Sequence, residues 1–213
     1  MVSQVPRRAG RPANPVSRSE LLAAARAAFA ETGYAGASMS DIAARIGLRK
    51  ASLFHHFRSK EALYFEMIAD ISDELGHLVV EADLGSGEFV ERLDRLGAMV
   101  VRYLGTHPNA ARLALRELVD GGPFSTGPGQ EQVELSLQAV VMFLEAGMRD
   151  RAVVSQDPRQ LAVSIIGLHL FHFAASQATE RLFGGSLGSD EAVESRSGAV
   201  ISQVRRLCGV PVT

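Results

Sequence analysis

The segment from residue 38 to residue 57 restricts the fold of this chain more than any other segment does. Ser38 and Asp41 form the capping pattern of a short helix, and Gly47 is a natural place for that helix to end. A second short helix is predicted from about residue 49 to residue 56. Two short helices that cross at a tight turn form a helix-turn-helix, which offers its second helix to the major groove of duplex DNA.

The second helix of this motif carries the residue types that groove reading requires. Leu53 and Phe57 are expected to hold it against a core. The opposite face combines cations for phosphates with donors and an aromatic ring for base edges, and its residues are Arg49, Lys50, Ser52, Phe54 and His55. The alternative interpretation is a three-helix cap whose basic face is only solvated.

Charge is divided unevenly along the chain. Residues 1–60 contain 10 Lys and Arg against 3 Asp and Glu, whereas residues 61–213 contain 12 against 21. A basic end on an acidic body implies that only this end contacts a polyanion.

Residues 1–16 predict a flexible basic arm that has no core of its own. Within the arm, the run from Arg8 to Pro12 resembles the core of a minor-groove AT-hook, with one extra alanine. Arginines on such an arm can enter a narrow A·T minor groove. The arm is therefore either a minor-groove contact or a solubilising tail.

The rest of the chain predicts helices only. Apolar residues recur at helical spacing, no run alternates with the period of a strand, and Gly- and Pro-rich stretches separate the helical segments. We therefore predict an all-α fold of about nine helices. Its parts are the arm at 1–16, a three-helix helix-turn-helix domain at 17–62 and a larger helical domain at 63–213.

One predicted helix, from Pro158 to about Phe183, is unusually apolar. Residues 160–179 contain no Asp, Glu, Lys or Arg, which is long enough to suggest a membrane span. The histidines, serines and Gln177 within it favour a buried helix instead. Its apolar surface exceeds one core-facing stripe, so we expect it to pack against a second subunit.

Two further features bear on where the protein resides. The N-terminus lacks the apolar stretch of a secretory signal. Cys208 is the single cysteine, which fits a reducing compartment. We therefore expect a cytoplasmic protein without membrane contact.

The run from Leu48 to Leu63, LRKASLFHHFRSKEAL, resembles the signature of the tetracycline-repressor (TetR) family. The upstream runs FAETGY at 29–34 and SMSDIA at 38–43 are similar to the first and second helices of that family. The resemblance implies that Ser38 and Lys60 contact phosphates and that Lys50, Ser52, Phe54 and His55 lie in or beside the major groove. This sequence departs from the family pattern by having Arg49 for Ser or Thr, Ala51 for Gly and Phe54 for Tyr.

For the larger domain, the resemblance implies a homodimer through the last two helices and a pocket for a small-molecule effector. A dimer would place two recognition helices about 34–36 Å apart, on successive major grooves. None of the expected lining residues is Asp, Glu, Lys or Arg, so the expected effector is mostly apolar and releases a repressor from its operator. The expected lining residues, for which ordinary core is the alternative role, are Met99, Tyr103, Met142, Phe143, Met148, His169 and Phe173.

Other classes of protein have less support in the sequence. A metal-responsive regulator would need His169 and His172 with a third ligand such as His107, and no Cys cluster or His-Glu-x-x-His run is present. An enzyme would need a phosphate loop or a nucleophile motif, and neither is found. We therefore expect no catalytic role, no cofactor and no metal site. A nonspecific architectural DNA-binding protein remains an alternative.

Overall fold

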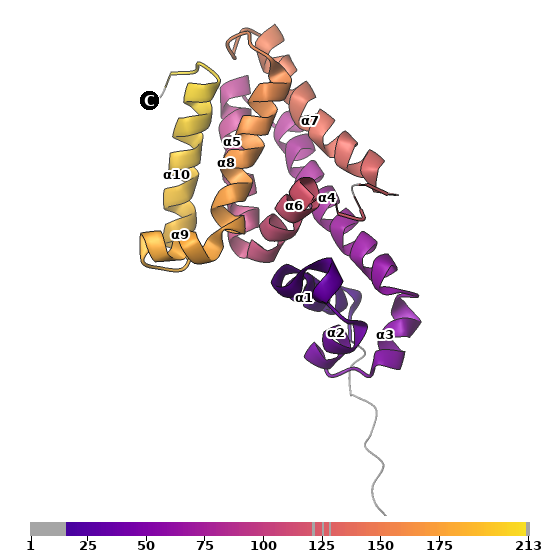
Figure 1. Cartoon of the computed structure of the whole chain (residues 1–213). Coiled ribbons are helices and arrows are strands. Elements are labelled where there is room, and N and C mark those ends of the chain that lie inside the picture. The colour runs from indigo at the N-terminus through magenta and orange to yellow at the C-terminus, as the bar shows by residue number, and fades with distance from the viewer. Residues whose placement is uncertain (1–15, 121, 125, 128, 212–213) are drawn as a thin grey trace, which may run out of the picture.

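The computed structural model describes residues 16–120, 122–124, 126–127 and 129–211, so the basic arm lies outside the described residues. Within these ranges it contains ten α-helices and no strand, which confirms the all-α prediction (Figure 1). The helices are α1 (Arg18–Gly36), α2 (Met39–Arg45), α3 (Lys50–His56), α4 (Lys60–Leu84), α5 (Phe89–Thr106), α6 (Pro108–Asp120), α7 (Gln130–Arg149), α8 (Pro158–Ala174), α9 (Ser176–Phe183) and α10 (Asp190–Leu207).

Helices α1, α2 and α3 form the small unit at the lower end of Figure 1. Ser17 and Glu20 close a capping box at the start of α1, and Gly33 interrupts the end of that helix with a φ of 73°. The unit packs around a core that α4 completes, whose fully buried side chains include Leu21, Phe29, Ile42, Leu53, Leu63 and Met67. The caps and the positive-φ glycine therefore fix the helix ends, and apolar burial fixes how the helices cross.

Helix α4 runs without a break from the small unit into the body (Figure 1). Its first half, including Ile68 and Ile71, belongs to the core shared with α1–α3. Farther along, Val79 belongs to a second core made by the body helices. The predicted boundary at residues 62–63 thus falls inside one continuous helix, which joins the two cores mechanically.

The body surrounds the second core with α5, α6, α7, α8 and α10. Helix α5 packs along α10, α6 along α8, and α7 along α4. The most deeply buried side chains here include Val101, Leu104, Leu144, Phe173 and Val200.

The prediction of a single helix from Pro158 to Phe183 is wrong. The chain bends by 77° at Ala175, so that α8 and α9 are separate helices, which accounts for ten helices where about nine were expected. Arg112 on α6 donates a hydrogen bond of 3.0 Å to the Ser176 hydroxyl at the bend. This contact ties α6 to the first residue of α9. No single helix in the described part of the chain is long and apolar enough to cross a membrane, and only the bent pair α8–α9 passes that test together.

Candidate DNA-binding surface and effector cavity

The surface of α3 has the arrangement that the sequence predicts. Leu53 is fully buried and Phe57 is 3% exposed, so these two side chains hold the helix to the core. On the outer face Lys50 and His55 are exposed, and the Lys50 ammonium lies 5.9 Å from the centre of the 40% exposed Phe54 ring. The helix therefore presents a cation and an aromatic ring together, as base and phosphate contacts require.

The start of α3 adds a further cation. Arg49 is the N-cap residue, its side chain makes no capping hydrogen bond, and it is exposed. Ser52, one turn along, is half-buried. Arg49 thus faces solvent at the helix end, while Ser52 lies at the edge of the same surface.

The exposed cations of this domain fall into two groups. Arg18 and Arg45 form ion pairs with Glu66 and Glu31 respectively. Arg49, Lys50 and Arg58 are exposed and have no ion pair with any described residue. The exposed cations without a described ion pair therefore lie on α3 or within two residues of its ends. Arg58 and the exposed His56 extend the surface beyond the residues expected from the sequence.

Ser38 and Lys60 make contacts within the protein. The Ser38 hydroxyl caps α2 by accepting the Asp41 N–H at 3.1 Å, and it donates to the Asp41 carboxylate at 2.7 Å. The Lys60 ammonium donates to the carbonyl oxygens of Tyr34 and Ala37, at 2.8 and 3.2 Å. A phosphate contact for either residue stays a prediction, and for Lys60 it would use the one remaining N–H bond.

In the body, α4, α5, α6, α7 and α8 together enclose a cavity of about 160 Å³. Its wall is mostly aliphatic and includes Ile68, Ile71, Leu75, Val79, Leu96, Val100, Val133, Val140, Ile165 and Leu170. Two hydroxyls, of Ser72 and Ser136, and two other polar side chains, of Glu117 and His169, interrupt this apolar surface.

Glu117 and His169 are the buried polar residues of this wall. The Glu117 carboxylate is 2% exposed and accepts a hydrogen bond from the Tyr64 hydroxyl, which together with burial raises the pKa of Tyr64. His169 is 6% exposed, its Nδ1 lies 2.8 Å from the carbonyl oxygen of Ile165, and its buried Nε2 lies beside the backbone of Gly97 on α5. Burial, together with the positive charge of Arg196, lowers the pKa of His169, so its ring is neutral.

Of the seven residues expected to line an effector pocket, His169 lines this cavity. The other six lie elsewhere. Phe143 and Phe173 are buried in the second core, and Met142 is 65% exposed on α7. Met99 and Met148 are half-buried, and the Tyr103 hydroxyl bonds to Glu74. Effector contacts for all seven stay predictions. The aliphatic residues of α4 and α7 that do line the cavity were missed, because their spacing is that of ordinary core.

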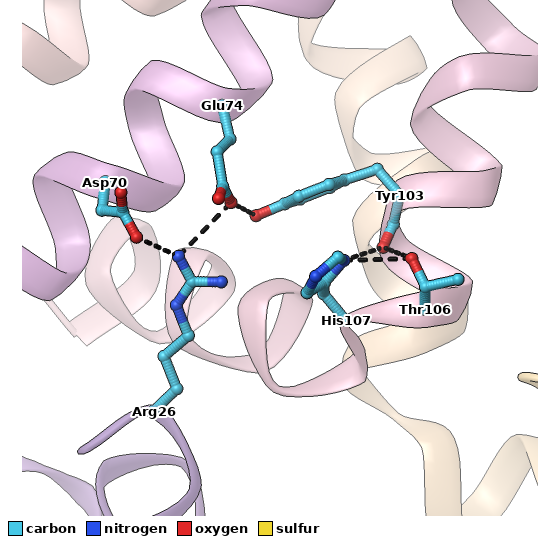
Figure 2. A network of polar contacts seen from close by, with 6 residues as sticks. All are labelled: Arg26, Asp70, Glu74, Tyr103, Thr106 and His107. Carbon is cyan, nitrogen blue, oxygen red and sulfur yellow. Dashed lines mark hydrogen bonds and ion pairs between the residues drawn. The ribbon is translucent and has the colours of Figure 1, made fainter. Parts of the chain in front are cut away.

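A polar network joins the small unit to the body (Figure 2). Arg26 on α1 forms ion pairs with Asp70 and Glu74 on α4, and Glu74 in turn accepts the hydroxyl hydrogen of Tyr103 on α5. The Arg26 side chain is only 12% exposed. Glu74 is adjacent in sequence to Leu75, which lines the cavity. The network therefore connects three helices at the junction between the two cores.

The histidines considered as metal ligands have other surroundings. His107 stacks on Tyr103 with ring centres 4.8 Å apart and bonds to that residue's carbonyl oxygen through Nδ1. His172 packs edge-on against Phe173 and Phe183. Among the described residues, no three His, Cys, Asp or Glu side chains come together as metal ligands.

Comparison with known proteins matches both regions of the chain. The model for bacterial regulatory proteins of the tetR family matches residues 21–67, and the model for the tetracyclin repressor-like C-terminal domain matches residues 90–204. The HTH-type transcriptional repressor AcnR of Corynebacterium efficiens is 30% identical over 146 residues, which cover 59% of this chain and 78% of that protein.

Solved structures agree on the fold. A regulatory protein of the tetR family from Rhodococcus RHA1 has a TM-score of 0.73 at 19% identity, covering 92% of this chain and 100% of its own. AibR, solved with isovaleryl coenzyme A and operator DNA, has a TM-score of 0.66 at 21% identity, covering 88% of this chain and 96% of its own. This chain therefore belongs to the tetracycline-repressor family of DNA-binding transcriptional regulators.

Proposed function

We propose that the chain is a non-enzymatic, dimeric repressor that leaves its operator when a small, mostly apolar molecule occupies the cavity between α4 and α8. One observation carries this proposal. Ile68 and Ile71 on α4 belong both to the core that supports α1–α3 and to the wall of the cavity. A molecule that presses on these side chains displaces part of the packing beneath the recognition helix, because close-packed cores do not deform freely.

The Arg26 network supports the same route. A shift of α4 relative to α1 or α5 changes the distances from Glu74 to Arg26 and to Tyr103 (Figure 2). The ligand-bound and DNA-bound arrangements then differ in ion pairing as well as in packing. A coupling of about 1–3 kcal/mol between the two sites would weaken operator binding roughly 5–150-fold.

Dimerisation is supported by an unpartnered apolar stripe on α8. Val163 is 68% exposed and Phe171 is 66% exposed, and Gly167 lies midway between them at a spacing of four residues. Leu207 on α10, 42% exposed, is a further apolar residue on the second helix of the predicted interface. Such a surface is typical of a self-complementary interface, so we propose that α8 and α10 pair with their copies about a two-fold axis.

The relatives add support for the two ligand classes. AcnR is named a transcriptional repressor, and AibR has been solved with operator DNA and with an acyl coenzyme A. For the present chain, the aliphatic cavity wall favours an apolar effector.

The proposal is tested by selecting genomic DNA fragments with purified protein and then measuring affinity for the enriched sequence. We expect one palindromic sequence, a steep loss of affinity with salt, and weaker binding when an apolar ligand is added. Equal affinity for all sequences would instead indicate a nonspecific architectural protein. An operator affinity that no bound ligand alters would contradict the effector part of the proposal.

A further inference from the structure

We infer that Gly76 sets the size of the effector, and that the apolar group of this ligand lies against the backbone of α4 at Gly76. The inference rests on the proposed function, because it names the residue that limits what the same cavity accepts. Three observations carry it: the position of Gly76 in the cavity wall, the open space beside it, and the lack of a packing or backbone reason for a glycine there.

Gly76 lies in the interior of the 25-residue helix α4, on the face that borders the cavity. Ser72, four residues earlier, and Val79, three residues later, also line the cavity. Residues at these spacings share one face of an α-helix, so a side chain at position 76 would point into the cavity. Gly76 is half-buried, which distinguishes it from a glycine on the solvent side of a helix.

The space beside Gly76 is open. A Cβ atom added to Gly76 would have no neighbouring atom within 4 Å. Two buried glycines of the body show the opposite situation, since a Cβ on Gly105 would lie 2.6 Å from Val193 and one on Gly147 would lie 2.4 Å from the Phe89 ring. A neighbouring side chain excludes a larger residue at those two positions, whereas no described side chain fills the room beside Gly76.

The backbone does not require a glycine at this position either. Gly76 lacks the positive φ that Gly33 and Gly47 have. A glycine inside a helix is less favourable than an alanine, because it loses more conformational freedom on folding. Gly167 and Gly198 also have open space around them, but both are exposed to solvent. Gly76 differs from these two because its missing side chain enlarges a cavity inside the fold.

The volume and wall of the cavity set the class of ligand. At about 160 Å³ the cavity is comparable to an engineered apolar cavity of about 150 Å³ that binds benzene. An aromatic ring or a short branched alkyl group therefore suits the space over Gly76. Leu118 on α6 and Leu137 on α7 line the same cavity and are 40% and 36% exposed, so the remainder of a larger effector can reach the surface beside them.

The test is a calorimetric titration of the full-length protein with benzene, toluene, ethylbenzene, propylbenzene and butylbenzene. In the unaltered protein each added carbon should lower the dissociation constant about fourfold until the space is filled, because one more CH₂ group is buried. Gly76→Ala should end this gain one carbon earlier, since its methyl group occupies the place of one carbon. Gly76→Leu should weaken binding of every member by about tenfold or more, and its operator affinity should no longer respond to them.

A second measurement needs no ligand. Gly76→Ala should raise the unfolding temperature of the protein by about 2–4 °C, since alanine favours the helix and its Cβ meets no neighbour. The matched control is His77→Ala, which alters the next residue of α4, exposed and outside the cavity wall. This control should leave every dissociation constant unchanged. If Gly76→Leu does not fold, Gly76→Ala still decides through both measurements.

The inference and the proposed function fail in different ways. If the ligands release the operator but bind both Gly76 variants as they bind the unaltered protein, Gly76 does not limit the effector and the proposed function stands. A lower unfolding temperature for Gly76→Ala would show that the space is not open, which overturns the inference by itself. If no member of the series binds, or if binding leaves operator affinity unchanged, the proposed function fails and the inference fails with it.

Discussion

The two regions that α4 connects are built in opposite ways. At its Lys60 end, the side chains expected to touch DNA point outward from a seven-residue helix that begins after Arg49 and ends before Phe57. Around Ile71 and Leu75, side chains from five helices point inward and share one cavity. A substitution on the outward surface costs little folding stability, because it does not disturb the core. A substitution in the shared cavity changes the packing of the side chains around it. DNA affinity and effector response should therefore be separable by mutation.

The largest expected effect comes from breaking the dimer. Phe171→Asp places a charge on the largest exposed side chain of the α8 stripe, so we expect monomers and an operator affinity lower by roughly 10²–10⁴-fold, because the two half-sites are no longer bound by linked domains. Sedimentation equilibrium measures the oligomeric state, and operator titration measures the affinity. Leu84→Asp is the matched control, since Leu84 is 81% exposed on α4, outside the stripe. A dimer that survives Phe171→Asp would place the interface on another face.

The next effect tests the outward surface alone. Lys50→Ala combined with His55→Ala should lower operator affinity on the order of 10²-fold, through lost base and phosphate contacts. The unfolding temperature should stay unchanged, because both side chains are exposed. Arg102→Ala removes an exposed cation from the body and should leave operator affinity within about twofold, since a single charge at this distance is screened by salt. Unaltered operator binding by the double variant would remove α3 from the interface.

A smaller effect is expected at the junction between the regions. Arg26→Ala should reduce the factor by which effector weakens operator binding by roughly 2–30-fold, while each affinity measured alone changes less. The control is Arg18→Ala, which breaks another ion pair between α1 and α4, with Glu66, but has no link to Tyr103. Operator titrations with and without effector give this factor for each variant. If this factor falls equally in both variants, the α1–α4 contact carries the coupling and the bond to Tyr103 on α5 does not.

The smallest effect concerns pH and the body. Burial lowers the pKa of His169, and it lowers the pKa of His172 to about 4. The unfolded chain, with a histidine pKa of about 6.5, then binds more protons than the folded one between pH 6.5 and 4. The contribution of the two neutral histidines to the free energy of unfolding is therefore fully present above about pH 6.5, and it falls as the pH decreases through this window.

Urea unfolding at several pH values checks this expectation. The free energy of unfolding should fall as the pH is lowered below 6.5, because the unfolded chain then takes up protons that His169 excludes in the folded state. The variant His169→Leu should show a correspondingly shallower decline between pH 6.5 and 5.5 than the unaltered protein. Identical slopes would mean that His169 is protonated in the folded state.

The accuracy of the sequence-based predictions differs between the same two regions. The cap that Ser38 forms with Asp41 and the buried positions Leu53 and Phe57 were all predicted from local pattern. The cavity was not, since six of the seven residues proposed for it lie elsewhere. Apolar residues at helical spacing look the same whether they fill a core or line a cavity. The bend at Ala175 likewise has no Gly or Pro to mark it, and the Ser176 hydroxyl beside it bonds to a side chain 64 residues away.

What the sequence by itself determined is the all-helical class, the helix-turn-helix, the basic end and the identity of the outward residues on α3. These follow from caps, glycines and periodicity, which act over three or four residues. Only the tertiary structure decided which helices enclose the cavity, which polar atoms face it and how Arg26, Glu74 and Tyr103 meet. Those features join residues that are 29 and 48 positions apart, and their distances depend on how whole helices pack.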